Sequence, residues 1–154
     1  MKLIHFFIFA IMAAIASAQT GPGPAPTPPS REPANVISLF SDAYTNVNVT
    51  NFSPYWSQST QVVVNDVITY TNLNFQGTYF EAQDVSTKEF FHVDFYTEDA
   101  TALEMFVNNY PGPETGYSLS GNIIAGEWVS VDIPLSTYNV VDLTGVNRLK
   151  VLGT

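Results

Sequence analysis

The chain has 154 residues, of which only 12% are charged, with five lysines and arginines, a formal net charge of -9 and no cysteine. So few cations argue against nucleic acid and anionic membrane surfaces as partners, because each phosphate contact needs Lys or Arg. The absence of cysteine excludes disulfides and thiolate catalysis. The length suits one domain. A surface this poor in charge must be covered by uncharged polar side chains, which suits a secreted protein with polar, uncharged ligands.

Residues 1–18 have the pattern of a secretory signal peptide. One cation near the start precedes an apolar run, and residues 16–18 (Ala-Ser-Ala) form a small-residue cleavage motif. We therefore predict cleavage before Gln19 and a protein that is secreted or held at the cell surface. A retained membrane anchor is the alternative. The apolar run is short for a membrane span and no basic residue directly follows it, so we expect no membrane span in the cleaved chain.

Residues 19–34 form a proline-rich linker, which holds most of the ten prolines in the chain. Proline at this density cannot join a sheet and keeps the backbone extended, as in a semi-rigid spacer. The alternative is an unstructured N-terminal tail.

Residues 35–154 are expected to fold as one all-β domain. Short runs of alternating apolar and polar side chains recur there, as in strands with one buried face. In chain order the expected strands are residues 35–41, 55–64, 67–76 with an extension beyond Gly77 to residue 81, 84–97, 101–108, 114–120, 127–133 and 146–152. About eight short strands without a long amphipathic helix predict a β-sandwich of the jelly-roll type.

The alternation is clearest in residues 84–97, which we interpret as a central strand. One face of its second half carries Phe91, Val93 and Phe95, and the other carries His92, Asp94 and Tyr96. In the same way we expect an inward set of Leu103, Met105 and Val107, and another of Val129, Val131 and Ile133. Trp128 falls in phase with Ser130 and Asp132, yet a tryptophan here is more often buried or covering a sheet than binding a ligand.

Sugar recognition needs aromatic surfaces against the faces of the ring, with fixed polar groups that bond to hydroxyls. The candidate carbohydrate-binding residues are Trp56, Asn74, Gln76, His92, Asp94 and Tyr96. If their strands share a sheet, the two amides lie near the face that carries His92. Tyr44, Tyr55 and Tyr110 sit in or beside loops that could close over one edge. The alternative for His92 and Asp94 is a satisfied surface pair.

Three segments resemble a known class of module: residues 36–44 (VISLFSDAY), the pattern from Asp84 to Asp94, and residues 128–136 (WVSVDIPLS). They are similar to β-sandwich, carbohydrate-binding-like modules attached to secreted bacterial polysaccharide hydrolases, with laminarinase-like enzymes of glycoside hydrolase family 16 as the catalytic partners. The resemblance covers nearly all of residues 35–154. It implies a polysaccharide ligand and an attached catalytic domain, and it indicates the sugar less specifically than the module.

Modules of this kind continue after a segment like residues 148–151 into a final strand with an Asp-Asn-aromatic motif, whereas this sequence ends at Thr154. We therefore expect a jelly roll that lacks its last strand, in a C-terminally truncated domain. In related jelly rolls a structural calcium joins the first strand region to that last strand, and Asp42 is the candidate carboxylate. The alternative is that Asp42 caps its own loop through the backbone. No other cofactor is expected.

Glycoside hydrolysis needs two positioned carboxylates. Glu89 and Asp94 would fall on opposite faces of a strand because their separation is odd, and no Glu-x-Asp-x-x-Glu arrangement of the family 16 type is present. The chain also lacks a Gly-x-Ser-x-Gly elbow. His5 leaves with the signal peptide, so a multi-histidine zinc site cannot form. We expect no catalysis by this segment.

The sequence thus predicts a secreted, non-catalytic module that binds a neutral polysaccharide such as a β-glucan and targets an attached glycoside hydrolase. Two alternatives stay open. The chain could be a structural or adhesive extracellular domain without a sugar site, or the N-terminal part of a glycoside hydrolase.

Overall fold

The computed structural model describes residues 22–154, so the predicted signal peptide, residues 1–18, lies outside the described part. The strands are β1 (Val49–Asn51), β2 (Gln61–Val64), β3 (Ile68–Thr71), β4 (Phe75–Gln83), β5 (Phe90–Thr97), β6 (Leu103–Asn108), β7 (Glu114–Ser118), β8 (Glu127–Pro134) and β9 (Val146–Gly153). Three short 3-10 helices complete the elements: η1 (Pro33–Asn35), η2 (Ser120–Asn122) and η3 (Leu135–Tyr138). Within residues 22–154, no helix is long and apolar enough to cross a membrane.

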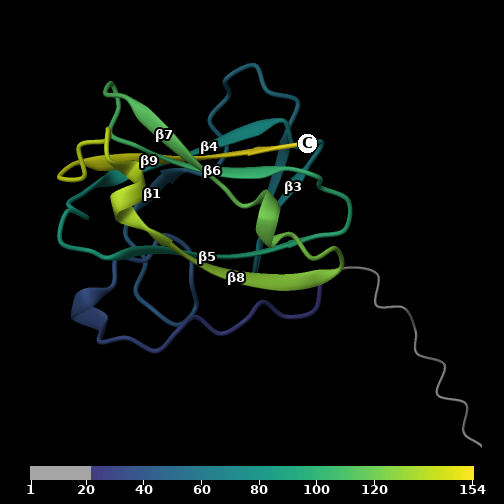
Figure 1. Cartoon of the computed structure of the whole chain (residues 1–154), viewed down its shortest axis with the longest axis horizontal. Coiled ribbons are helices and arrows are strands. Elements are labelled where there is room, and N and C mark those ends of the chain that lie inside the picture. Colours follow the sequence, from purple (N-terminus) through teal and green to yellow (C-terminus); the bar gives the residue numbers. More distant parts are fainter. Residues whose placement is uncertain (1–21) are drawn as a thin grey trace, which may run out of the picture.

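Antiparallel pairing joins these strands into one five-stranded sheet and two smaller ones. The five-stranded sheet, called the main sheet below, has the order β1-β4-β9-β6-β7. The pairs β2–β3 and β5–β8 form the two-stranded sheets. In Figure 1, β5 and β8 run as a second layer below the main sheet, and the purple-to-blue N-terminal segment passes beneath them. The predicted all-β architecture is confirmed.

The core lies between the main sheet and the β5–β8 pair. Val131 and Ile133 of β8 are buried in one cluster with Leu103 and Val107 of β6. The sets predicted to point inward join this cluster, either buried or packed against it: Phe91, Val93, Phe95, Leu103, Met105, Val107, Val129, Val131 and Ile133. These predicted phases are therefore confirmed. Burial of such side chains is the main favourable term in folding, at about 1.5–3 kcal/mol for each large one.

Helix η3 closes one end of this core. Leu135 and Tyr138 are buried on it, and the Tyr138 hydroxyl donates a hydrogen bond to the backbone oxygen of Met105 at 3.2 Å. Burial raises the pKa of the Tyr138 phenol, and nearby Tyr117 and Glu104 raise it further. The phenol is thus held neutral and paired inside the core.

Several predicted elements differ from the structure. Residues 35–41 do not form a strand, because the Asn46 side chain accepts bonds from the Ser38 hydroxyl at 2.6 Å and the Ser41 N–H at 3.0 Å and holds this part of the chain in a loop. Strand β1 instead lies within residues 42–54, which were expected to be a loop. In the described part of the chain β5 pairs only with β8, so it is not a central strand. Alternation of apolar and polar residues predicts which side chains lie on each face of a strand, but it does not predict which strands pair with it.

Replacement of Tyr138 by phenylalanine tests the buried phenol through its pH dependence. Because the pKa of Tyr138 is raised above its ordinary value of 10.0, its contribution to stability is complete below pH 10 and is lost as the pH rises above 10. We expect Tyr138→Phe to lower the free energy of unfolding by about 1 kcal/mol at pH 7 through the lost hydrogen bond. It should also weaken the alkaline loss of stability that we expect for the parent chain.

Urea unfolding at pH 7 and pH 11 measures both effects. Burial also raises the pKa of Tyr70, so part of the alkaline loss should remain in the variant. Equal alkaline losses in the variant and the parent would contradict the assignment to Tyr138.

Candidate functional site

The outward face of the β5–β8 pair carries three of the predicted site residues. His92, Asp94 and Tyr96 lie opposite Asp132, Ser130 and Trp128 in the antiparallel register. His92 Nδ1 is 2.7 Å from Asp132 Oδ1, and His92 Nε2 is 3.3 Å from Asp94 Oδ2. The Ser130 hydroxyl donates to the other oxygen of Asp94. This face is therefore a polar network whose members bond to one another, as in the alternative reading of a satisfied surface pair.

The N-terminal segment covers part of this face. The Trp128 indole N–H donates to the Gly23 backbone oxygen at 3.0 Å, and the purple segment follows the underside of β5 and β8 in Figure 1. The Tyr96 hydroxyl donates to Glu98, which raises the pKa of that phenol. The side chains of His92 and Asp94 are only 27% and 15% exposed. This face is therefore only partly covered, since the Asp132 side chain keeps 44% of its surface exposed and a hollow remains between the N-terminal segment and His92, Asp94 and Trp128.

Gln76 lies on β4 of the main sheet and Asn74 directly precedes that strand, so neither shares a sheet with His92, and both hold a loop. Gln76 is 1% exposed, and its Oε1 accepts a bond from Gln58 Nε2 at 2.9 Å. Asn74 Oδ1 accepts bonds from the Ser59 N–H at 3.0 Å and the Thr60 hydroxyl at 3.1 Å. Both amides thus fix the loop of residues 54–60, which carries Trp56. The condition under which the two amides would lie near His92, a shared sheet, is therefore not met.

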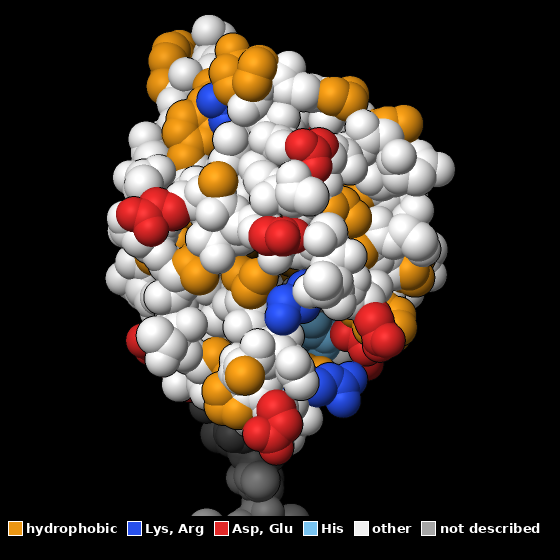
Figure 2. Space-filling model, turned by 90° about the vertical axis from the view of Figure 1, so that its left-hand side faces the viewer, with side chains coloured by type: hydrophobic (Ala, Val, Ile, Leu, Met, Phe, Trp, Pro, Cys, Tyr) orange, Lys and Arg blue, Asp and Glu red, His pale blue; other side chains and the backbone are white. Residues whose placement is uncertain are grey.

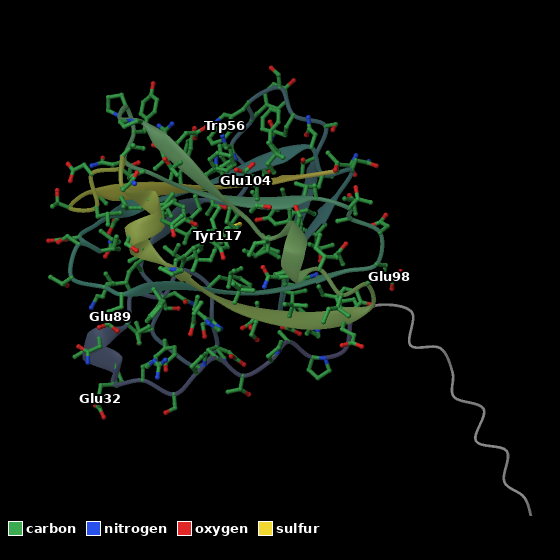
Figure 3. The ribbon with its side chains drawn as sticks, in the orientation of Figure 1. Glu32, Trp56, Glu89, Glu98, Glu104 and Tyr117 are labelled. Atoms are coloured by element: carbon green, nitrogen blue, oxygen red, sulfur yellow. The ribbon has the colours of Figure 1, made fainter. Side chains whose placement is uncertain are left out.

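Trp56 lies on the outer face of the main sheet, the side away from β5 and β8, whereas Tyr117 lies between the layers (Figure 3). The indole packs directly over Gly77, where a Cβ atom would come within 2.2 Å of the ring. Its N–H donates to the Tyr79 hydroxyl at 2.6 Å. Ser57, the next residue, has a φ of 65°, a conformation that non-glycine residues seldom adopt and that clusters at functional sites.

Beyond Tyr79 the stack continues with Arg148 of β9. The guanidinium carbon lies 4.3 Å from the ring centre of Tyr79 and 3.6 Å from that of Tyr110. The Trp56 and Tyr79 ring centres are 5.7 Å apart. One aromatic and cationic ladder therefore runs from Trp56 through Tyr79 and Arg148 to Tyr110.

The loop between β6 and β7 is tied down at Tyr110. The Tyr110 N–H donates to Asn147 Oδ1 at 3.0 Å, and Asn147 Nδ2 donates back to the Tyr110 oxygen at 3.2 Å. This reciprocal pair fixes the loop to β9. Tyr110 nevertheless remains 54% exposed, which leaves much of its surface available to a partner.

Between Trp56 and this loop lies a groove of about 600 Å³, called the outer groove below. Its lining includes Trp56, Phe75, Asn108, Tyr110, Glu114, Arg148, Lys150 and Leu152. Asn108 is only 8% exposed, and its Oδ1 has no hydrogen-bond partner among residues 22–154. A buried carbonyl oxygen without a partner costs about 1–3 kcal/mol and calls for a water or a ligand group that satisfies it.

The outer groove is electrically distinct from the rest of the chain. Lys150 lies 3.9 Å from the Phe106 ring centre and forms an ion pair with Glu114. With Arg148, the lining holds two cations and one carboxylate, and its formal charge is +1 in a chain of -9. On the face drawn in Figure 2, acidic groups are scattered among white backbone and uncharged side chains and orange hydrophobic ones.

The described residues do not fit a structural calcium at Asp42. Calcium takes six to eight oxygen ligands, whereas Asp42 is exposed in a bend. No group of three or more histidine, aspartate or glutamate side chains within residues 22–154 is placed to hold a metal. The outer groove itself offers only Glu114 as a carboxylate among its described lining residues.

Of the predicted site residues, the outer groove contains Trp56 alone, with Asn74 and Gln76 supporting it from below. Sequence reasoning missed Arg148, Lys150 and Asn108 as site residues and mentioned Tyr110 only as a loop aromatic. One signal was present: Arg148 and Lys150 alternate with Leu149 and Val151 in a chain with few cations. Two of its five basic residues were thus placed on one face of one strand.

The comparisons with known proteins found no match to a protein-family model, to a curated protein or to a solved structure. The function is therefore argued from the geometry of the chain.

Replacement of Gly77 by alanine tests how Trp56 is seated. The added methyl group would meet the indole at 2.2 Å, so we expect the ring to be displaced and its fluorescence emission to shift to the red. Gly121→Ala is the matched control, because an added Cβ there has no neighbour within 4 Å. An unchanged emission spectrum in Gly77→Ala would contradict the packing of Trp56 on β4.

Removal of residues 19–31 tests the cover over the β5–β8 face. The indole N–H of Trp128 would lose its bond to Gly23, and we expect acrylamide to quench the fluorescence of Trp128 more strongly. A Trp56→Phe background leaves Trp128 as the only tryptophan, since the chain contains two. Equal quenching with and without the segment would show that it does not cover this face in solution.

Proposed function

We propose that this chain is a jelly-roll β-sandwich module that binds a polysaccharide in the outer groove and does not cleave it. The observation that supports this most is the pairing of exposed aromatic surface with fixed polar groups in one groove. Trp56 and Tyr110 come from two different loops and both line the groove. Arg148, Lys150, Glu114 and Asn108 lie between or beside them.

This combination suits a sugar ring. Aromatic faces bury the apolar C–H surface of a pyranose, and a few fixed donors and acceptors bond to its hydroxyls. The groove is open rather than enclosed, so a long chain can lie along it. Hydrolysis by paired carboxylates needs two such groups, and Glu114 is the only one lining the described groove. Binding without cleavage is thus the better match.

The wider setting follows from the sequence. The pattern of residues 1–18 supports export, and the resemblance of residues 35–154 supports attachment to a glycoside hydrolase. In this proposal the module sits at the cell surface or outside the cell and holds the enzyme on its polysaccharide. A β-glucan is the first neutral ligand to test.

A second candidate is a structural or adhesive domain without a sugar site. The β5–β8 face favours it, because the polar side chains there bond to one another and the N-terminal segment covers part of them. This reading makes the outer groove a by-product of packing, and it predicts that no glycan binds.

Affinity electrophoresis tests the proposal on gels that contain laminarin, xylan, mannan, hydroxyethyl cellulose or the acidic polymer polygalacturonate. We expect at least one glycan to retard the chain. Trp56→Ala and Tyr110→Ala should each weaken binding about tenfold or more, the effect of about 1.4 kcal/mol of lost stacking. No retardation on any glycan, acidic ones included, would favour the structural reading.

Tyr96→Ala is the matched control for these two variants, because it removes a tyrosine from the β5–β8 face. We expect it to bind as the parent does. Each variant is first checked by its urea unfolding midpoint, so that a loss of binding is not a loss of fold. Loss of binding in Tyr96→Ala with retention in Trp56→Ala would move the site to the β5–β8 face.

A further inference from the structure

Arg148 is the feature of the outer groove that binding to a neutral glycan leaves unexplained. Its guanidinium is stacked between Tyr79 and Tyr110. Stacking uses the two faces of the guanidinium and leaves the N–H donors that lie in its plane. Those donors have no hydrogen-bond or ion-pair partner among residues 22–154. The two rings therefore hold the Arg148 guanidinium in one orientation, and its N–H groups remain able to donate hydrogen bonds to a ligand.

The other cation of the groove is compensated. Lys150 pairs with Glu114 and packs on Phe106. The uncompensated charge of the groove is therefore that of Arg148. A stacked guanidinium presents two parallel donors in the geometry that matches a carboxylate, and such bidentate pairs are among the strongest hydrogen bonds in proteins.

Asn108 supplies an independent observation in the same groove. Its Oδ1 is buried and has no partner among the described residues, and as a carbonyl oxygen it can only accept a hydrogen bond. A ligand that suits this groove thus offers an anionic, planar acceptor to Arg148 and hydroxyl donors beside it, one of which could bond to Asn108 if the side chain turned to expose its oxygen, which has less than 1 Å² of accessible surface. A hexuronate carries both groups on one ring.

We propose that the outer groove selects polysaccharides that contain hexuronate units, with Arg148 donating two hydrogen bonds to the uronate carboxylate. This inference rests on the proposed function. Trp56 and Tyr110 supply the stacking surface for the sugar. The negative charge of the whole chain does not oppose this contact strongly, because charges beyond about 8 Å are screened at physiological salt.

The first experiment uses the unaltered chain and one backbone polymer in two forms. Isothermal titration compares polygalacturonate with the same polymer after methyl esterification, at 150 mM salt and again at 500 mM. We expect the free carboxylate form to bind about tenfold more tightly at 150 mM, and the preference to persist at 500 mM because it comes from a bidentate contact. Equal affinity for the two forms would overturn the proposal.

The second experiment uses variants of matched charge. Arg148→Gln should bring the affinity for polygalacturonate down to that for its methyl ester, and Arg148→Lys should recover only part of the difference, because an ammonium lacks the planar fork. Lys88→Gln removes the same charge outside the groove and should leave the preference unchanged. An equal loss in Lys88→Gln would show that net charge, not Arg148, sets the preference.

Three further outcomes separate the proposals. Retardation by laminarin together with equal affinity for polygalacturonate and its methyl ester would refute the uronate assignment and leave sugar binding intact. Binding to none of the glycans would refute both. Dextran sulfate that binds as tightly as polygalacturonate through Arg148 would refute selectivity for a carboxylate.

Discussion

The packing of β8 against the main sheet is the contact on which the rest of the structure depends. Ile133 is completely buried there, beside Val131 of the same strand and Leu103 and Val107 of β6. Because this layer occupies the inner face of the main sheet, the outer face is left to be shaped by loops. The same contact forces the alternate side chains of β5 and β8 outward, where they form their own polar network under the N-terminal segment.

On the outer face, local backbone features place the groups that line the outer groove. Gly77 gives the indole of Trp56 room to lie on β4, and Ser57 holds the left-handed turn that follows it. Asn147 fixes the loop that carries Tyr110. The resulting ladder combines residues from two loops, β4 and β9, so each stacked group orders its neighbour before any ligand arrives. Such preorganisation lowers the entropy that binding must overcome.

Sequence periodicity predicted the faces of the strands well and their neighbours poorly. The inward sets on β5, β6 and β8 follow from alternation alone, because a buried face demands an apolar residue at every second position. Which sheet a strand joins depends on long-range pairing, and for this reason His92 and Gln76 could not be placed relative to one another. Gln76 is polar yet buried, since Gln58 and Pro54 supply its partners from a loop. That contact has no signature in a short window of sequence.

The low content of charged residues in the chain predicted a largely uncharged surface, but it did not predict the character of the outer groove. An average over all residues favoured an uncharged ligand, whereas the two cations of β9 are concentrated at one place. Their positions at every second residue of a strand were visible in the sequence. Their significance depended on Tyr79 and Tyr110, which lie far from them along the chain.

The position of β9 has a consequence for how the molecule assembles. This strand lies between β4 and β6, both of which precede it in the chain. Before β9 docks, the β1–β4 and β6–β7 pairs are separate pieces with open edges, which are vulnerable to pairing with other chains. Closure is therefore a late, long-range step of the kind that slows folding. Since Arg148 arrives on this strand, a partly folded chain holds no complete groove, and formation of the groove is coupled to completion of the sheet.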